Sequence, residues 1–242
     1  IPGAVRADLD RHLSAPHGDP DAASGGRHPL PSRETFAAWL GSVGFSSDMQ
    51  AVVYDRQRAN YCGRLWWMLK WVGHENVAAL DGGLPAWYAA GGVVTSGAAT
   101  KHPPTQFQAS TPRATLVTAS QVQERLGQPT QNLIDARAEA RFRGEVEPID
   151  PVAGHIPGAL NRPFGSNIND DGLFKPAVVL KAEFLELLDG RDPGTVVHHC
   201  GSGVSAVPNI IAMEIAGLGR AALFAGSWSE WCRDPALPVE KG

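Results

Sequence analysis

Cys200 is the residue whose type and surroundings point most directly to chemistry. It follows an apolar run at residues 196–197 and two histidines, and it precedes the segment Gly201-Ser202-Gly203. This order predicts a buried strand that ends at the cysteine, a tight turn and then a helix. The free N–H groups and the dipole of a helix N-terminus favour negative charge, so we expect Cys200 to react as a thiolate.

The residues that follow the cysteine suit an anionic sulfur. Gly201 and Gly203 permit positive φ, which would turn backbone amides inward as an anion-binding nest. Ser202 and Ser205 add hydroxyl donors. The loop therefore suits a nucleophilic sulfur on Cys200 that becomes a persulfide and stays anionic. The loop residues predicted to bind substrate are Gly201, Gly203, Val204 and Ser205.

Two other chemistries of such a loop are disfavoured. Cysteine-dependent phosphatases need an arginine six residues after the cysteine, and that position is Ala206. A metal site on His198, His199 and Cys200 is disfavoured because successive strand side chains point to opposite faces. No second cysteine or histidine pair has ligand spacing. We expect neither a metal nor an organic cofactor, and we expect one of the two histidines to influence the thiolate.

The overall composition limits the class of partner. The net charge of −4 does not favour nucleic acid or an acidic membrane surface, and no apolar run approaches the length of a membrane span. The three cysteines are too few for a disulfide framework, so a reducing, cytoplasmic setting is the simplest expectation. Cys62, in an apolar helical pattern, and Cys232, near the chain end, are expected to be packing residues.

Strand and helix patterns alternate around the cysteine loop. The expected strands are 51–54, 77–80, 116–117, 133–134, 195–199 and 221–224, and the expected helices are 59–72, 118–126 (opened by a Thr118–Gln121 capping box) and 204–216. Such alternation predicts an α/β fold with a mainly parallel sheet flanked by helices in each half. Ligands of these sheets bind beyond the carboxyl ends of the strands, where Cys200 is expected.

A weak internal repeat relates the two halves. Ile1-Pro2-Gly3-Ala4 returns at residues 156–159. Three further pairs recur at a constant offset of 144 residues: Gly73 with Gly217, Gly82 with Gly226, and Trp87 with Trp231. The first copy lacks the strand–helix–strand material that precedes the motif in the second. We therefore expect an N-terminally truncated first domain at 1–92, a linker at 93–113 and a second domain at 114–242. Residues 16–31 are expected to form a surface loop.

The cysteine loop also resembles that of a known family. The segment Cys200–Ala206, CGSGVSA, is similar to the active-site loop of 3-mercaptopyruvate sulfurtransferases, whereas thiosulfate sulfurtransferases more often have basic residues after the cysteine. Further matching segments are Asp135-Ala136-Arg137, Arg141–Gly144, Gly154–Ala159, Arg64–Met68 and Asp81–Gly83. The chain is identified as a member of the rhodanese superfamily, with two tandem rhodanese-like domains.

The resemblance assigns roles to particular positions. Cys200 is similar to the sulfur-carrying nucleophile, Ser202 to the serine proposed to relay a proton, and Arg141 to the arginine that binds the anionic substrate. The family's first domain is catalytically silent, in agreement with Arg56 at the position equivalent to Cys200. Tyr54 and Arg64 are candidates to line the domain interface near the site.

Two features depart from the family pattern. Some mercaptopyruvate enzymes have a second substrate arginine just after a Glu-Pro element, but here that element continues from Glu147-Pro148 to Ile149-Asp150. The resemblance also implies a histidine immediately before the first IPGA motif and an aspartate upstream, which support the serine; Ile1 is the first residue here, so neither can be assigned. Of the neighbouring arginines, Arg137 is expected to bond backbone carbonyls and Arg143 to be solvated.

The resemblance implies a sulfurtransferase that moves sulfur from 3-mercaptopyruvate, through a Cys200 persulfide, to a thiol acceptor such as thioredoxin or to cyanide. A thiosulfate donor at the same site, or a sulfur-carrier module that does not turn over, are the alternatives. The expected partners are a small anionic sulfur donor and a thiol or cyanide acceptor, with no nucleic acid and no membrane.

Overall fold

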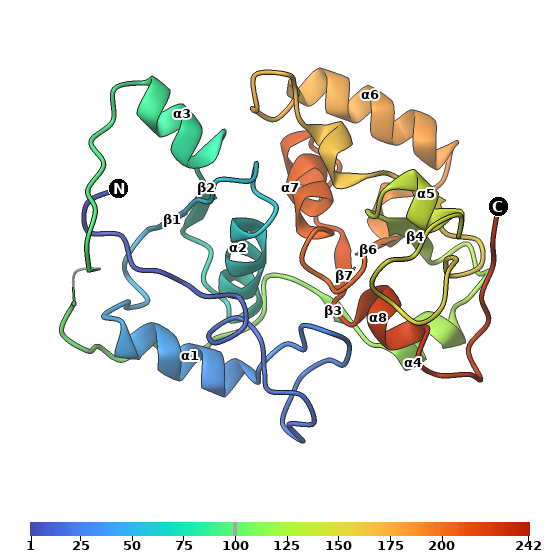
Figure 1. The fold of residues 1–242 in the computed structure, drawn as a ribbon, viewed down its shortest axis with the longest axis horizontal. Coiled ribbons are helices and arrows are strands. Elements are labelled where there is room, and N and C mark those ends of the chain that lie inside the picture. The colour runs from blue at the N-terminus through green and yellow to red at the C-terminus, as the bar shows by residue number, and fades with distance from the viewer. Residues whose placement is uncertain (99–100) are drawn as a thin grey trace.

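The computed structural model describes residues 1–98 and 101–242, and it has an α/β fold. Figure 1 shows two units side by side, the first formed by the N-terminal part of the chain and the second by the chain from β3 onward. Each unit contains parallel strands, as the sequence predicted. None of the helices in the described part of the chain is long and apolar enough to span a lipid bilayer.

The first unit is built on two parallel strands. β1 (Ala51–Val53) pairs with β2 (Val77–Ala79), with Ala51 opposite Val77. The helices of this unit are α1 (Arg33–Ser42), α2 (Cys62–Trp71) and α3 (Gly83–Ala89). α1 begins after Ser32, whose side chain accepts a hydrogen bond from the Thr35 N–H and so caps the helix.

The second unit has a five-stranded parallel sheet in the order β3-β7-β6-β4-β5. Its strands are β3 (Leu116–Val117), β4 (Asn132–Asp135), β5 (Leu160–Asn161), β6 (Val196–His199) and β7 (Ala222–Phe224). β6 is the central strand, and all of its residues are buried. The chain therefore reaches Cys200 from the middle of the sheet.

Helices lie between the strands of this sheet and after the last strand, β7. They are α4 (Ala119–Glu124), α5 (Glu139–Phe142), α6 (Ala177–Leu188), α7 (Val207–Ile215) and α8 (Ser227–Trp231), with single 3-10 turns at η1 (Phe164–Asn167) and η2 (Pro193–Thr195). α4 opens with the predicted capping box, because the Thr118 and Gln121 side chains each accept a hydrogen bond from the other residue's N–H.

The predicted strands agree with the observed ones to within two residues, but two helices begin later than predicted. α2 begins at Cys62 rather than at residue 59, and α7 begins at Val207 rather than at residue 204. In both places the expected first turn of the helix belongs to a loop. The helical residue pattern continues through these positions, but tertiary contacts hold the backbone in another conformation.

The two units share one hydrophobic core. α2 packs against α7, as Figure 1 shows at the centre of the molecule. The buried cluster that contains Trp66 and Met68 of the first unit also contains Ile210 and Ile211 of the second. Both helices directly follow a strand–loop junction, so this contact brings the loop after β6 against the first unit.

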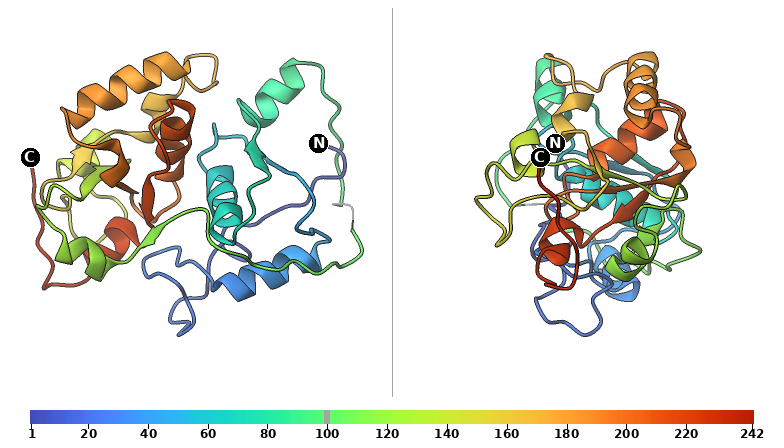
Figure 2. Two further views of the ribbon diagram at one scale, coloured as in Figure 1. Left: turned by 180° about the vertical axis from the view of Figure 1, so that it is seen from behind. Right: turned by 90° about the vertical axis from the view of Figure 1, so that its right-hand side faces the viewer.

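The described part of the predicted linker lies along the first unit. Residues 101–113 contain neither helix nor strand, but the Thr105 N–H donates to the carbonyl of Gly41 at 2.8 Å. Figure 2 shows this segment running along α1 before it enters β3. The segment is therefore held by hydrogen bonds over this stretch. Residues 99–100 of the predicted linker lie outside the described residues.

Candidate active site

Cys200 lies at the carboxyl end of β6, within the core that the two units share. Its side chain is only 2% exposed. The Cys200 N–H donates to Ser227 Oγ at 3.0 Å, and its carbonyl accepts from the Trp228 N–H at 3.0 Å. The first residues of α8 thus fix the backbone of the cysteine on both sides.

Gly203 is the glycine that the loop requires. Its φ is +73°, and a Cβ at this position would lie 2.1 Å from the carbonyl oxygen of Ala225. The expectation that Gly201 also has a positive φ is wrong. The absence of a side chain at Gly201 gives room instead, because a Cβ there would lie 3.2 Å from Arg27 Nη2.

The loop offers unpaired backbone donors. Within the described residues, the N–H groups of residues 201–206 donate to no protein acceptor, and the next amide, that of Val207, donates to the carbonyl of Val204 at 3.2 Å. Val204 is buried and Ser205 is half-buried. Unpaired amides beside a buried sulfur are suited to bind negative charge on that sulfur or on its substrate.

Ser202 has a histidine partner from the first unit. Ser202 Oγ lies 2.8 Å from His28 Nδ1, and Asp10 Oδ1 lies 3.6 Å from His28 Nε2. The second distance is too long for a hydrogen bond but short enough for an electrostatic effect. Burial, followed by the charges of Arg64 and Arg27, lowers the pKa of His28 below its ordinary 6.5. The neutral imidazole can therefore accept a proton from the serine at neutral pH.

The sequence left the histidine that supports the serine unassigned, and in the structure His28 takes this place. His28 lies in the 16–31 segment, which we expected to be a surface loop. That segment instead contacts the second unit, where the Arg27 N–H donates to Ser229 Oγ at 2.9 Å. In the sequence, His28 is marked only by its place in the segment Gly-Gly-Arg-His-Pro at residues 25–29, which does not indicate a functional role. Its relation to Ser202 arises only when the units pack together.

Arg141 lies beside the cysteine loop. It is in the last turn of α5, and its Nε and Nη2 atoms donate to the Glu147 carboxylate at 3.2 and 2.7 Å. Nη2 also lies 3.2 Å from Asp150 Oδ2. Nη1 is 3.5 Å from the position that a Cβ of Gly201 would take. Two carboxylates therefore hold the guanidinium group while its remaining nitrogen faces the loop.

Arg64 reaches the same loop from α2 of the first unit. It is fully buried, and its guanidinium donates to the carbonyls of Gly203 at 3.3 Å, Leu13 at 3.2 Å and His28 at 2.9 Å. Burial lowers the pKa of Arg64 to about 10, and the nearby Cys200 opposes that effect. Arg64 is thus a buried positive charge that joins the cysteine loop to the segment that carries His28.

The other arginines near Arg141 are placed as expected. Arg137 is buried, pairs with Asp135 and donates to the carbonyl of Gly154 at 2.7 Å. Arg143 is exposed and pairs with Glu139. Neither arginine has a hydrogen bond or an ion pair with the residues of the cysteine loop in the part of the chain that the structure describes.

The two histidines before Cys200 lie on different sides of their strand. His198 Nε2 is 3.1 Å from Met213 Sδ on α7, whereas the His199 ring lies 6.4 Å from that of Phe224. Burial lowers the pKa of His198 to about 3 and also lowers that of His199. Both rings are therefore neutral, and they do not converge on one point with Cys200.

The sequence matches the Rhodanese-like domain over residues 1–90 and 118–234. The chain belongs to the rhodanese family. A probable 3-mercaptopyruvate sulfurtransferase from Pseudomonas aeruginosa is 47% identical over 245 residues, which cover all of this chain and 84% of the relative. A thiosulfate sulfurtransferase from Cricetulus griseus is 36% identical over 252 residues, which cover all of this chain and 81% of the relative.

A solved structure of this kind also shares the fold. The 3-mercaptopyruvate sulfurtransferase from Leishmania major matches with a TM-score of 0.76 and 30% identity, over 95% of this chain and 62% of that chain. The relatives carry the names of both donors, and all transfer sulfur by name. This rhodanese is a sulfurtransferase, as the sequence predicted.

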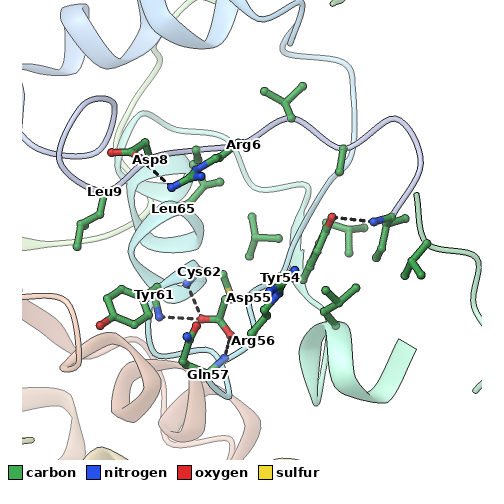
Figure 3. A pocket seen from close by; sticks show the side chains of 18 of the residues that line it. Arg6, Asp8, Leu9, Tyr54, Asp55, Arg56, Gln57, Tyr61, Cys62 and Leu65 are labelled. Atoms are coloured by element: carbon green, nitrogen blue, oxygen red, sulfur yellow. Dashed lines mark hydrogen bonds and ion pairs between the residues drawn. The ribbon is translucent and has the colours of Figure 1, made fainter. Parts of the chain in front are cut away.

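The first unit of this rhodanese has a loop in the equivalent position but no cysteine there. The loop joins β1 to α2, and Arg56 stands at the position that the repeat aligns with Cys200. Figure 3 shows the Asp55 carboxylate at its centre. This carboxylate accepts hydrogen bonds of 2.8 to 3.1 Å from the N–H groups of Gln57, Ala59, Tyr61 and Cys62.

A cavity of about 1570 Å³ borders this first-unit loop (Figure 3). Tyr54, which we expected near the domain interface, lines this cavity, and His28 reaches its wall, whereas Cys200 does not line it. Cys62 and Cys232 are buried and free, as expected of packing residues. Burial raises the pKa of both thiols, so neither is an activated nucleophile.

Proposed function

We propose that this rhodanese transfers sulfur in two steps through a persulfide on Cys200. In the first step the Cys200 thiolate attacks the terminal sulfur of a small anionic donor. The bond between that sulfur and the rest of the donor breaks, and Cys200 keeps the sulfur as an anionic persulfide. In the second step an acceptor takes the outer sulfur and restores the thiolate. Such a mechanism gives ping-pong kinetics.

The unpaired amides of residues 201–206 are the observation that carries this proposal. They adjoin a cysteine that is buried at the end of a central strand, and Arg64 adds a buried positive charge nearby. Preorganised donors in a site that excludes water stabilise an anion without reorganising during the reaction. The same donors suit the thiolate, the persulfide and the negative charge of the donor. The first unit has no cysteine in its equivalent loop, and it contributes His28 and Arg64 to the site of the second unit.

The pair formed by Ser202 and His28 favours 3-mercaptopyruvate as the donor. When sulfur leaves this donor, its thiol loses a proton, its carbon–sulfur bond breaks, and the carbon gains a proton to give pyruvate. Ser202 Oγ and His28 Nδ1, 2.8 Å apart, can relay that proton from sulfur to carbon. Thiosulfate needs no such relay, because sulfite leaves as an anion.

Thiosulfate is the second candidate donor. The segment after Glu147 and Pro148 has Asp150 and no second arginine, which removes one expected ligand for a carboxylate. The thiosulfate sulfurtransferase from Cricetulus griseus also aligns with the whole chain. Competition between the donors decides the matter: we expect 3-mercaptopyruvate to have the higher kcat/KM, and the reverse order assigns the site to thiosulfate.

The proposed acceptor is a thiol, such as that of thioredoxin, or cyanide. Either nucleophile attacks the outer sulfur of the persulfide, breaks the sulfur–sulfur bond and releases the Cys200 thiolate. A cytoplasmic location completes the proposal. The three free cysteines fit a reducing compartment.

Intact-protein mass after treatment with a donor tests the central step. We expect the wild-type chain to gain one sulfur atom and to lose it when a thiol or cyanide is added. Cys200→Ser should gain none, while Cys62→Ala and Cys232→Ala, which alter the other two thiols, should still be loaded. Loading of Cys200→Ser, or a wild type that stays unloaded with both donors, would refute the proposal. A loaded protein that never releases sulfur would instead be a carrier module.

A further inference from the structure

Ser227, the first residue of α8, has a backbone conformation that serine rarely adopts. Its φ is +56°, in the left-handed region that costs residues other than glycine conformational energy. The residue is fully buried. Strained residues of this kind persist only where the surrounding contacts hold them, and they gather at functional sites. The strain at Ser227 therefore directs attention to what its side chain does.

The equivalent turn of the first unit has a glycine instead. Gly83 lies 144 residues before Ser227, at the offset of the internal repeat, and its φ is +57°. In both turns the N–H of the next residue donates to the carbonyl of the residue that begins the loop, Asp55 at 2.9 Å and Cys200 at 3.0 Å. Glycine thus satisfies the backbone of this turn without strain. What the serine adds in the second unit is its hydroxyl group.

This hydroxyl group joins the ends of β7 and β6. The pairing of the two strands ends where His198 lies opposite Leu223. Beyond that pair, Ser227 Oγ donates to the carbonyl of Phe224 at 3.0 Å and accepts from the Cys200 N–H at 3.0 Å. Because the single hydroxyl hydrogen is used on Phe224, the oxygen offers only lone pairs to Cys200. The side chain therefore extends the link between the strands as far as the cysteine.

We propose that Ser227 is a positioning residue for sulfur transfer, which fixes the peptide of Cys200 so that its sulfur faces the amides of residues 201–206. This inference rests on the proposed function. Cys200 is only 2% exposed, so water does not replace the serine as an acceptor, and a buried N–H without a partner is costly. Without the hydroxyl group, the peptide would turn toward another acceptor and move the sulfur. A small displacement is enough, because the amides stabilise charge only at hydrogen-bond distance.

Ser227→Ala and Ser227→Gly test the inference, because both remove the hydroxyl group but differ in backbone strain. Glycine relieves the strain of a positive φ and alanine keeps it, so we expect the glycine variant to unfold at the higher urea concentration. Sulfur loading, followed by intact mass, should nevertheless slow by a similar factor in both variants, roughly tenfold, the effect of one lost hydrogen bond. If the serine only supported the fold, the loading rate would follow stability, and the glycine variant would load faster than the alanine variant.

A second measurement needs no sulfur donor. The rate at which iodoacetamide alkylates Cys200, measured against pH, reports the thiolate itself. In both Ser227 variants the midpoint of this profile should move to higher pH by roughly one pH unit, the equivalent of a tenfold change. Ser32→Ala is the matched control, because the Ser32 hydroxyl also accepts a backbone N–H, that of Thr35 at 3.1 Å, but lies at the start of α1.

The control should lose stability and keep the wild-type pH profile and loading rate. An unchanged midpoint in both Ser227 variants, or loading at the wild-type rate, would show that the serine does not position the cysteine. Failure of the proposed function would look different, because the wild type itself would then gain no sulfur from either donor.

Discussion

The loop after β1 and the loop after β6 have the same layout and opposite contents. In the first unit, the Asp55 carboxylate accepts four backbone hydrogen bonds from the loop that it begins. In the second unit, the N–H groups of residues 201–206 have no protein acceptor among the described residues. Each loop leads into a helix, and the two helices, α2 and α7, pack against each other.

The comparison shows how one scaffold gives an inert loop and a reactive one. Hydrogen bonds from N–H groups to a charged acceptor contribute about 1.5 to 3 kcal/mol each, so the loop around Asp55 stabilises itself. The loop around Cys200 leaves its donors open to an anion that arrives with the substrate. The second loop depends more on its surroundings, and contacts from Ser227, Trp228 and Arg64 hold it in place.

Gly203→Ala should have the largest effect, because it distorts the loop after β6 that carries Cys200. An alanine there would have a positive φ and would bring its Cβ to within 2.1 Å of the Ala225 carbonyl oxygen. We expect loss of persulfide formation by at least about a hundredfold and a drop of a few kcal/mol in the free energy of unfolding. Intact-mass loading and urea unfolding measure the two effects.

Gly217→Ala is the matched control for that change. Gly217 has a similar φ of +68° but has open space where a Cβ would be. Only the conformational strain of about 1 to 2 kcal/mol should remain, with loading unchanged. If both variants load sulfur at the wild-type rate, the shape of the cysteine loop does not control the chemistry.

Asp55→Ala should remove the carboxylate that accepts the four backbone hydrogen bonds of the loop after β1. We expect the free energy of unfolding to fall by about 2 to 4 kcal/mol when four amides lose a charged acceptor. This is less than four times the contribution of one bond, because the amides at the exposed residues Gln57 and Tyr61 can bind water instead. Sulfate should restore part of the lost stability by occupying the vacated amides. Asp234→Ala is the control, since Asp234 is exposed and accepts a single hydrogen bond of this kind, from the Ala236 N–H. Equal effects of sulfate on both variants would contradict the comparison.

The contrast between the loops also explains what the sequence could and could not predict. The strand that leads into Cys200 and the helix beyond it follow from local patterns. The extent of each loop does not, because Asp55 and Gly203 set it through contacts that override helical propensity. His28 and Arg27 were missed because their distance from Ser202 and Gly201 is fixed by the packing of two units. No local pattern encodes such a contact.

Ser202→Ala and His28→Gln should separate the two donors. Both changes remove the proton relay but leave Cys200 and the loop amides. We expect kcat with 3-mercaptopyruvate to fall roughly tenfold to a hundredfold, the usual contribution of general acid–base catalysis. kcat with thiosulfate should change by less than about threefold, because that reaction moves no proton. Steady-state kinetics with both donors measures the ratio, and parallel losses with both would show that the pair only supports the fold.

The smallest expected effect is a shift in pH dependence. Burial and the positive charges of Arg64 and Arg27 lower the pKa of His28 below 6.5, so the imidazole that accepts the serine proton stays neutral at and above that pH. The ratio of kcat for 3-mercaptopyruvate to kcat for thiosulfate should therefore be constant above pH 6.5 and should fall only at lower pH. Groups that both reactions need, such as the Cys200 thiolate, change both kcat values equally as they titrate, so their effect cancels in the ratio.

Two variants should move this decline in opposite directions. Asp10 raises the pKa of His28, so Asp10→Asn should shift the decline to lower pH, whereas Arg27→Met removes a charge that lowers the pKa and should shift it to higher pH. Asp10 is 80% exposed, so its shift should be the smaller one and should shrink as salt is added. Shifts in the same direction would mean that another group controls the decline. An unchanged decline in His28→Gln would remove His28 from the relay altogether.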